Sequence, residues 1–159
     1  MLFLSRTFLN SSIIKTLMKK YVYLEGLVTA DAAFDAFGKT IEEVFENCAL
    51  ATAGIMIDFK TLKTKITKKI IIVAENEEKL LFNFLDQIIF LKDSEQLLFK
   101  KFKVKITNAK QFRLESDCIG DKINQETQKL GNDLKAVTYH NFKLEQTKQG
   151  WSARIVLDI

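Results

Sequence analysis

Apolar residues recur along this chain at two spacings, one typical of helices and the other of strands. From Ile41 they return every three or four residues, which predicts a helix that runs to about Met56. A similar run follows Asn76 and predicts a second helix, whose apolar face carries Leu80, Leu81, Phe84, Leu85, Ile88 and Leu91. Strand-like runs begin again after Lys92-Asp93-Ser94.

Both predicted helices have clear start signals. Thr40 is followed three residues later by Glu43, the spacing of a capping box, in which each side chain binds a free backbone N–H of the first turn. Asn76 is a favourable N-cap, and Glu77 and Glu78 suit the positive end of the helix dipole. The helices should therefore begin directly after Thr40 and Asn76.

The remaining apolar runs are rich in β-branched and aromatic residues and read as strands. We expect a loop over Glu25–Asp31 and a hairpin turn over Glu145–Gly150. The predicted strands are Tyr21–Leu24, Ala32–Phe37, Ile66–Ala74, Leu97–Ile106, Gln111–Asp117, Leu134–Leu144 and Trp151–Leu157. Two helices packed on a mostly antiparallel sheet system make an α+β fold.

The composition of the chain narrows its class. It has 159 residues, of which 47% are hydrophobic and 28% charged, as in a globular protein, and its net charge is only +4. It has no apolar run long enough to span a membrane. Cys48 and Cys118 have no partner at metal-ligand spacing, and Cys48 falls on the apolar side of its helix. We therefore expect a reducing, cytoplasmic setting.

One domain is expected over residues 18–159, because no Pro/Gly/Ser linker divides the chain. Residues 1–17 contain no acid and have Arg6, Lys15 and several Ser and Thr, which are features of a weak targeting segment. They lack a long apolar core and a small-residue cleavage site. We interpret them as an N-terminal extension, with Met18 as a plausible start directly before the first strand.

Four motifs follow one another along the chain: Thr29-Ala30-Asp31, the helix start Gly38–Glu43, the strand Lys135–His140, and the pair Asp158-Ile159. Together they resemble the archease family. The second helix also resembles the Leu-Leu and Trp-Leu-Asn pattern of that family, and the resemblance spans about residues 20–159. One departure is clear, because Val28 stands where the family usually has a His before Thr-Ala-Asp.

The resemblance implies a function as well as a fold. It implies an archease-like, non-enzymatic, chaperone-like accessory protein that helps the GTP-dependent RNA ligase of tRNA splicing to attach GMP and turn over repeatedly. It implies that the protein contacts RNA indirectly, through the ligase. It also implies a divalent cation, Ca²⁺ or Mg²⁺, held by Asp31, Asp158 and Ile159.

The residues themselves leave alternatives open at this site. Oxygen ligands without sulfur suit Ca²⁺ or Mg²⁺ better than zinc, and Ile159 can add only backbone oxygens. Asp31 could instead be a turn residue, and Asp158 a polar strand end. Lys135 and His140 are candidates for contact with a partner or a nucleotide. Lys135 could equally be a solvated strand residue, and His140 a structural hydrogen-bonding one.

A direct RNA-binding module is the main alternative. Two runs of lysines could track phosphates from a sheet surface: Lys60, Lys63, Lys65, Lys68 and Lys69, then Lys100, Lys101, Lys103 and Lys105. Against it, the chain has no aromatic-interleaved motif for stacking bases, and lysines on edge strands also prevent aggregation. An enzyme acting alone is disfavoured, because no phosphate-binding glycine loop and no marked nucleophile occur.

Overall fold

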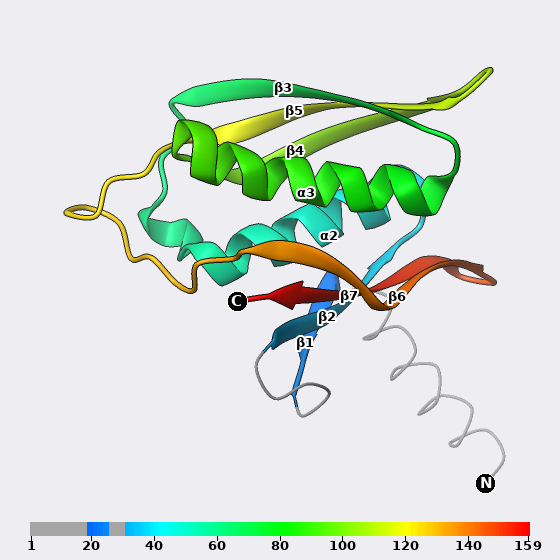
Figure 1. Ribbon diagram of the computed structural model, residues 1–159, viewed down its shortest axis with the longest axis horizontal. Helices are drawn as coiled ribbons and strands as arrows, with labels where there is room; N and C mark the ends of the chain where they lie inside the picture. The colour runs from blue at the N-terminus through cyan, green and yellow to red at the C-terminus, as the bar shows by residue number, and fades with distance from the viewer. Residues whose placement is uncertain (1–18, 26–30) are drawn as a thin grey trace, which may run out of the picture.

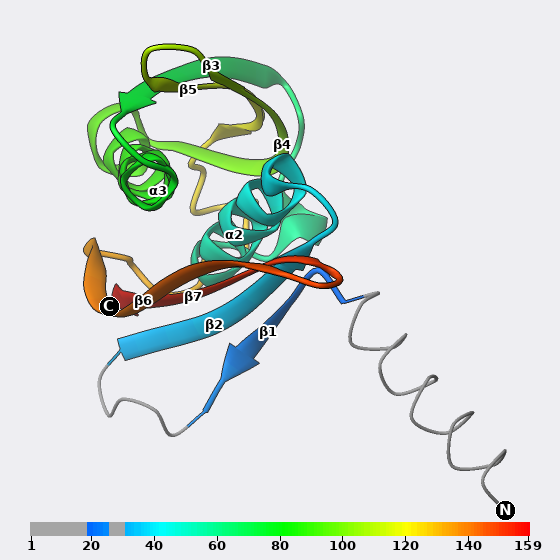
Figure 2. The same cartoon turned by 90° about the vertical axis from the view of Figure 1, so that its right-hand side faces the viewer.

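Two antiparallel sheets enclose a layer of two helices (Figure 1). This computed structural model describes residues 19–25 and 31–159. Turning the molecule by 90° shows the helices in the middle layer, with one sheet on either side (Figure 2). The α+β class predicted from the sequence is therefore confirmed. The sheet system is divided into two separate sheets, and the helices lie between them.

The first sheet has the strand order β1-β2-β7-β6 and joins the two ends of the described chain. Its central pair is antiparallel over eight consecutive residue partners, from Asp31 opposite Asp158 to Gly38 opposite Trp151. The four strands are β1 (Tyr21–Leu24), β2 (Asp31–Gly38), β6 (Ala136–Thr147) and β7 (Gly150–Asp158).

The second sheet has the order β3-β5-β4 and is built from the middle of the chain. Its strands are β3 (Ile66–Ala74), β4 (Leu97–Asn108) and β5 (Phe112–Lys122). All pairings in both sheets are antiparallel. The seven predicted strands are thus all present, with ends that differ from the predicted ones by a few residues.

The two helices begin where their caps predicted. Helix α2 spans Ile41–Met56, and the Thr40 hydroxyl accepts a hydrogen bond from the Glu43 backbone N–H at 3.2 Å. Helix α3 spans Glu77–Glu95, and the Asn76 side chain accepts one from the Lys79 backbone N–H at 2.8 Å. A short 3₁₀ turn, η1 (Phe59–Thr61), follows α2.

The core lies between the layers and is dominated by aromatic and aliphatic side chains. Phe34 of β2, Phe45 of α2 and Phe84 of α3 are fully buried, and the last two rings stack at 6.4 Å. Cys48 is fully buried among them, as predicted, and burial raises the pKa of its thiol. Burial likewise raises the pKa of the Cys118 thiol to about 12, so both groups behave as small apolar side chains.

Three of the sequence expectations concern residues outside the described part of the chain. These are the extension over residues 1–17, the position of Val28, and the Thr29-Ala30 portion of the first motif. The expected loop before β2 ended one residue too late. Asp31 was expected in a loop, but it is the first residue of β2.

The N-cap of α2 gives a first prediction. Thr40→Ala removes the hydroxyl that satisfies the Glu43 N–H, so the free energy of unfolding should fall by about 1 kcal/mol. Thr40→Ser keeps the hydroxyl and should lose much less. Urea denaturation of the three proteins measures both changes, and equal losses in the two variants would contradict a capping role.

Candidate functional site

Asp31 and Asp158 lie directly opposite each other at one end of the first sheet. Asp31 opens β2 and Asp158 closes β7, and the two residues are register partners. Side chains of directly paired residues on antiparallel strands project from the same face of a sheet, a few ångströms apart. The structure therefore brings together the two acidic residues that the sequence analysis selected, and both are half-buried.

The same face of the same two strands also carries an oppositely charged pair. Asp35 lies opposite Arg154, and the guanidinium donates two hydrogen bonds to the carboxylate at 2.8 and 2.9 Å. These bonds raise the pKa of the Arg154 guanidinium. Asp35 shares the face of Asp31, four residues along β2, but it is committed to this ion pair.

The Asp31–Asp158 pair differs because it joins like charges. Among the residues that the structure describes, no Lys or Arg forms an ion pair with either carboxylate. Like charges directly opposite each other destabilise a sheet. An arrangement of this kind is stabilised when a cation lies between the carboxylates.

A third strand completes this edge of the sheet. Ala136 at the start of β6 is the other register partner of Asp158, and the Lys135 backbone N–H donates to the Asp158 carbonyl at 2.8 Å. Lys135 itself is exposed, whereas Ile159 is half-buried and packs against the core. The edge thus collects Asp31, Asp158, Ile159 and Lys135.

The oxygen ligands at this edge supply part of the coordination shell of a hard cation. Within residues 19–25 and 31–159, no group of three or more His, Cys, Asp or Glu side chains could hold a metal ion. The side chains supply two carboxylates, and Ca²⁺ takes six to eight oxygens. The remaining ligands would have to be backbone oxygens, such as that of Ile159, and water.

The segment that leads into β6 is fixed to the end of α2. The backbone N–H groups of Gly131 and Asn132 donate to the carbonyls of Met56 and Ile55 at 2.8 and 2.9 Å. These carbonyls have no partner inside the helix. A Cβ on Gly131 would lie 2.2 Å from the Ile55 carbonyl oxygen, so only glycine allows this close approach.

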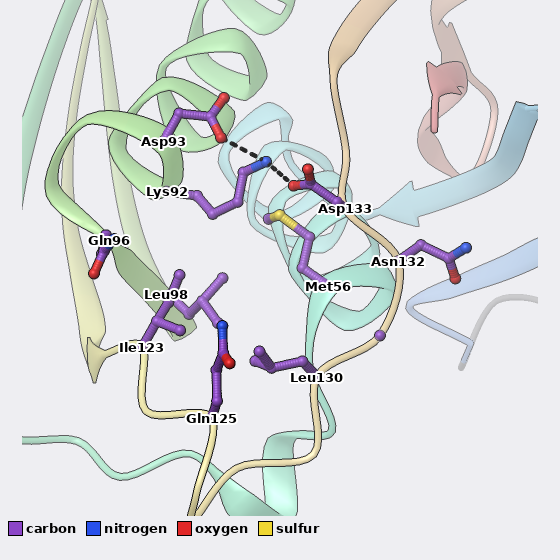
Figure 3. Close-up of a pocket in the computed structure, with 11 residues that line it drawn as sticks. Met56, Lys92, Asp93, Gln96, Leu98, Ile123, Gln125, Leu130, Asn132 and Asp133 are labelled. Carbon is purple, nitrogen blue, oxygen red and sulfur yellow. Dashed lines mark hydrogen bonds and ion pairs between the residues drawn. The ribbon is translucent and has the colours of Figure 1, made fainter.

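Lys92 of α3 holds the same segment from the other side. Its side chain is only 8% exposed, and its ammonium donates to the Leu134 carbonyl at 2.6 Å and to the Asp133 carboxylate. It also pairs with Asp93 at 2.8 Å, and Figure 3 shows the ammonium between the two carboxylates. Burial lowers the pKa of Lys92, but the hydrogen bonds outweigh it and leave a net rise.

A cleft of about 630 Å³ lies beside this lysine. Figure 3 shows the apolar lining residues Met56, Leu98, Ile123 and Leu130 below the carboxylates of Asp93 and Asp133, which pair with Lys92. Its other lining residues include Asn132 and Asp133, from the segment that enters β6. The segment that holds Asp158 through the Lys135 backbone N–H therefore also forms part of the cleft wall.

His140 lies elsewhere on β6. It is exposed, and its side chain makes no hydrogen bond with another residue in the described part of the chain. It belongs to residues 139–142, an irregular stretch of β6 that does not pair in register with β7. The structural hydrogen-bonding interpretation thus has no support here, and His140 is not at the Asp31–Asp158 edge.

The lysine-rich sheet surface is neutralised in part. Lys103 of β4 and Lys69 of β3 both lie opposite Asp117 of the central strand β5, and the Lys69–Asp117 distance is 3.8 Å. Lys105 likewise lies opposite Glu115. An acidic strand between two basic ones weakens the attraction for a phosphate backbone, so this face gives little support to direct RNA binding.

Comparison with known proteins identifies the family. The model of the Archease protein family (MTH1598/TM1083) matches residues 21–159. The chain belongs to the archease family. Protein archease of Methanosarcina mazei is 35% identical over 143 residues, which cover 89% of this chain and 97% of the relative. Protein archease of Pyrococcus abyssi is 33% identical over 144 residues, with 89% and 100% covered.

Solved archease structures agree with the fold. The solution structure of Methanobacterium thermoautotrophicum protein 1598 superposes with a TM-score of 0.79 at 35% identity, covering 89% of this chain and all of that one. The crystal structure of an archease from Thermotoga maritima, described as a possible chaperone, has a TM-score of 0.56 at 21% identity. It covers 87% of this chain and 99% of its own, and shows the fold alone.

Two further observations concern the helices. No helix in the described part of this archease family member is long and apolar enough to cross a membrane. Lys92 is the residue that the sequence analysis missed. It follows Leu81, Leu85 and Ile88 at helical spacing, and a lysine on that apolar stripe was the available signal.

Lys92 gives a second prediction. Lys92→Met deprives the buried Leu134 carbonyl of its donor, so the free energy of unfolding should fall by about 1–3 kcal/mol. Lys79→Met on the same helix breaks only the exposed pair with Glu75 and should change it by less than about 0.5 kcal/mol. Urea denaturation measures both, and a Lys92→Met variant as stable as the wild type would contradict the assigned role.

Proposed function

We propose that this protein is a non-enzymatic accessory protein that activates the GTP-dependent RNA ligase of tRNA splicing. It promotes attachment of GMP to the ligase and so restores the ligase for further turnover. Membership of the archease family supports this proposal. So does the description of the T. maritima relative as a possible chaperone, since both roles act on another protein.

The observation that carries the proposal is the Asp31–Asp158 pair. Two half-buried carboxylates face each other without a basic partner in the described chain, while the pair four residues away is neutralised by Arg154. We propose that Asp31, Asp158 and backbone oxygen of Ile159 hold Ca²⁺ or Mg²⁺. When bound, the cation supplies a positive centre that oxygen atoms of a nucleotide or a partner protein can coordinate.

The chain's own residues provide the frame for that edge. The Lys135 N–H fixes the Asp158 carbonyl, and Lys92 and the end of α2 fix the segment before Lys135. Lys135 projects from the frame as an exposed cation and is our candidate for contact with the ligase or its nucleotide. The protein brings no thiolate nucleophile, because the pKa values of Cys48 and Cys118 are raised by burial.

The cation site gives a third prediction, in which the sign of the effect depends on the cation. In EDTA, Asp31→Asn relieves the like-charge contact and should stabilise the protein by up to about 1 kcal/mol. With Ca²⁺ or Mg²⁺ added, the Tm of the wild type should rise and that of the variant should not. Asp158→Asn should behave in the same way.

Asp35→Asn is the matched control, on the same strand and the same face. It breaks the ion pair with Arg154, so it should destabilise the protein with or without the cation while keeping the cation-dependent rise in Tm. A wild-type Tm that stays the same when either cation is added would contradict the assignment of this site.

Ligase guanylylation gives a fourth prediction. At limiting ligase, wild-type protein should increase the amount of ligase that becomes labelled from GTP over repeated turnovers, and Asp31→Asn should lose most of that stimulation. Asp35→Asn should retain it. Using this pair of variants avoids a chelator, which would act on every metal in the reaction. No stimulation by the wild type would overturn the proposed function.

A further inference from the structure

A partly exposed aromatic cluster bridges α3 and β6. The rings of Phe82 and Tyr139 stack in parallel, with centroids 3.9 Å apart and an interplanar angle of 1°. Phe142 packs against both, at 6.0 and 5.8 Å. Tyr139 is nevertheless 60% exposed. Phe82 therefore holds one face of the tyrosine ring and leaves much of the side chain available to a partner.

The backbone of β6 is shaped to present this cluster. Thr138 pairs with Val156 and Lys143 with Arg154, so residues 139–142 lie opposite Ile155 alone. Within that bulge Asn141 has φ 53°, a left-handed conformation that non-glycine residues adopt rarely. β6 is also an edge strand. Bulges at sheet edges typically re-aim side chains, and this one directs Tyr139 and Phe142 onto α3.

Two acids flank the cluster on α3, and Lys79, also one turn before Phe82, is paired with Glu75 at 3.1 Å. Glu78 and Asp86 lie one helical turn before and after Phe82, so they share its side of α3, and both are exposed. Neither Glu78 nor Asp86 forms an ion pair among the residues that the structure describes. Carboxylates around an aromatic platform repel a phosphate backbone and attract Lys and Arg side chains.

We propose that this aromatic–acidic surface, formed by Phe82, Tyr139, Phe142, Glu78 and Asp86, docks a protein segment with an apolar side chain flanked by basic residues. Building on the proposed function, that segment belongs to the ligase. Tyr139 lies three residues along β6 from Ala136, the register partner of Asp158, which is about 10 Å along the strand. Because β6 is an edge strand, a single partner that wraps around this edge can occupy the surface and reach the cation edge at the same time.

Titration calorimetry of the full chain with purified ligase tests the proposal. Tyr139→Ala and Asp86→Lys should each weaken binding at least tenfold, while circular dichroism and Tm show that the variants are folded. Asp86 is exposed and is assigned a role by charge alone, so Asp86→Lys should leave the packing intact. This variant remains informative if Tyr139→Ala unfolds. Rising salt should weaken wild-type binding and affect Asp86→Lys less, since the carboxylate contributes by charge.

Matched controls lie on other parts of the molecule. Ile71→Ala removes a 48% exposed apolar side chain from β3 of the other sheet, and Glu126→Lys reverses an exposed acid in the connection before β6. Both should bind ligase as the wild type does. Losses as large as those of Tyr139→Ala would overturn the assignment of the surface.

Three further results would overturn the proposal, and they separate it from the proposed function. Wild-type stimulation of the ligase with unchanged binding by Tyr139→Ala and Asp86→Lys rejects the surface alone. No binding and no stimulation by the wild type rejects both. Tight, salt-sensitive binding of tRNA to the protein alone, abolished by Tyr139→Ala, would make the aromatic cluster a base-stacking platform instead.

Discussion

The pairing of β2 with β7 is the constraint on which both the core and the candidate site depend. Its eight residue partners place Phe34 opposite Ile155 in the core and Asp31 opposite Asp158 at the edge. A shift of one residue would turn every side chain of one strand to the other face. The burial of Phe34 and Ile155 therefore also fixes the register that brings the two carboxylates together.

Much of this arrangement was predictable because its signals are local. The caps at Thr40 and Asn76 and the apolar spacing of both helices depend on neighbours within a few residues, and they predicted the helix starts correctly. That Asp31 and Asp158 meet came from the family resemblance, since two strands at opposite ends of the chain carry no local mark of their pairing. The division into two sheets was not predictable, because strand patterns do not specify partners.

The features that the sequence did not reveal are those that depend on tertiary contacts. Lys92 is buried because Asp133 and Leu134, from a distant segment, supply the acceptors that a lysine needs in a protein interior. At the bulge over residues 139–142, Tyr139 packs on Phe82 of α3, a contact between distant segments. A period of two along β6 predicts a regular strand and does not show this departure.

The long separation of β2 and β7 has a consequence for how the protein folds. Contacts between residues so far apart form late, because closing a long loop costs chain entropy before the contact returns any stability. The helices and the β3-β5-β4 sheet can assemble from nearer neighbours, whereas the carboxylate pair appears only with the closing strand. A molecule that has not finished folding lacks this edge, so the proposed cation site would form only when the whole domain is complete.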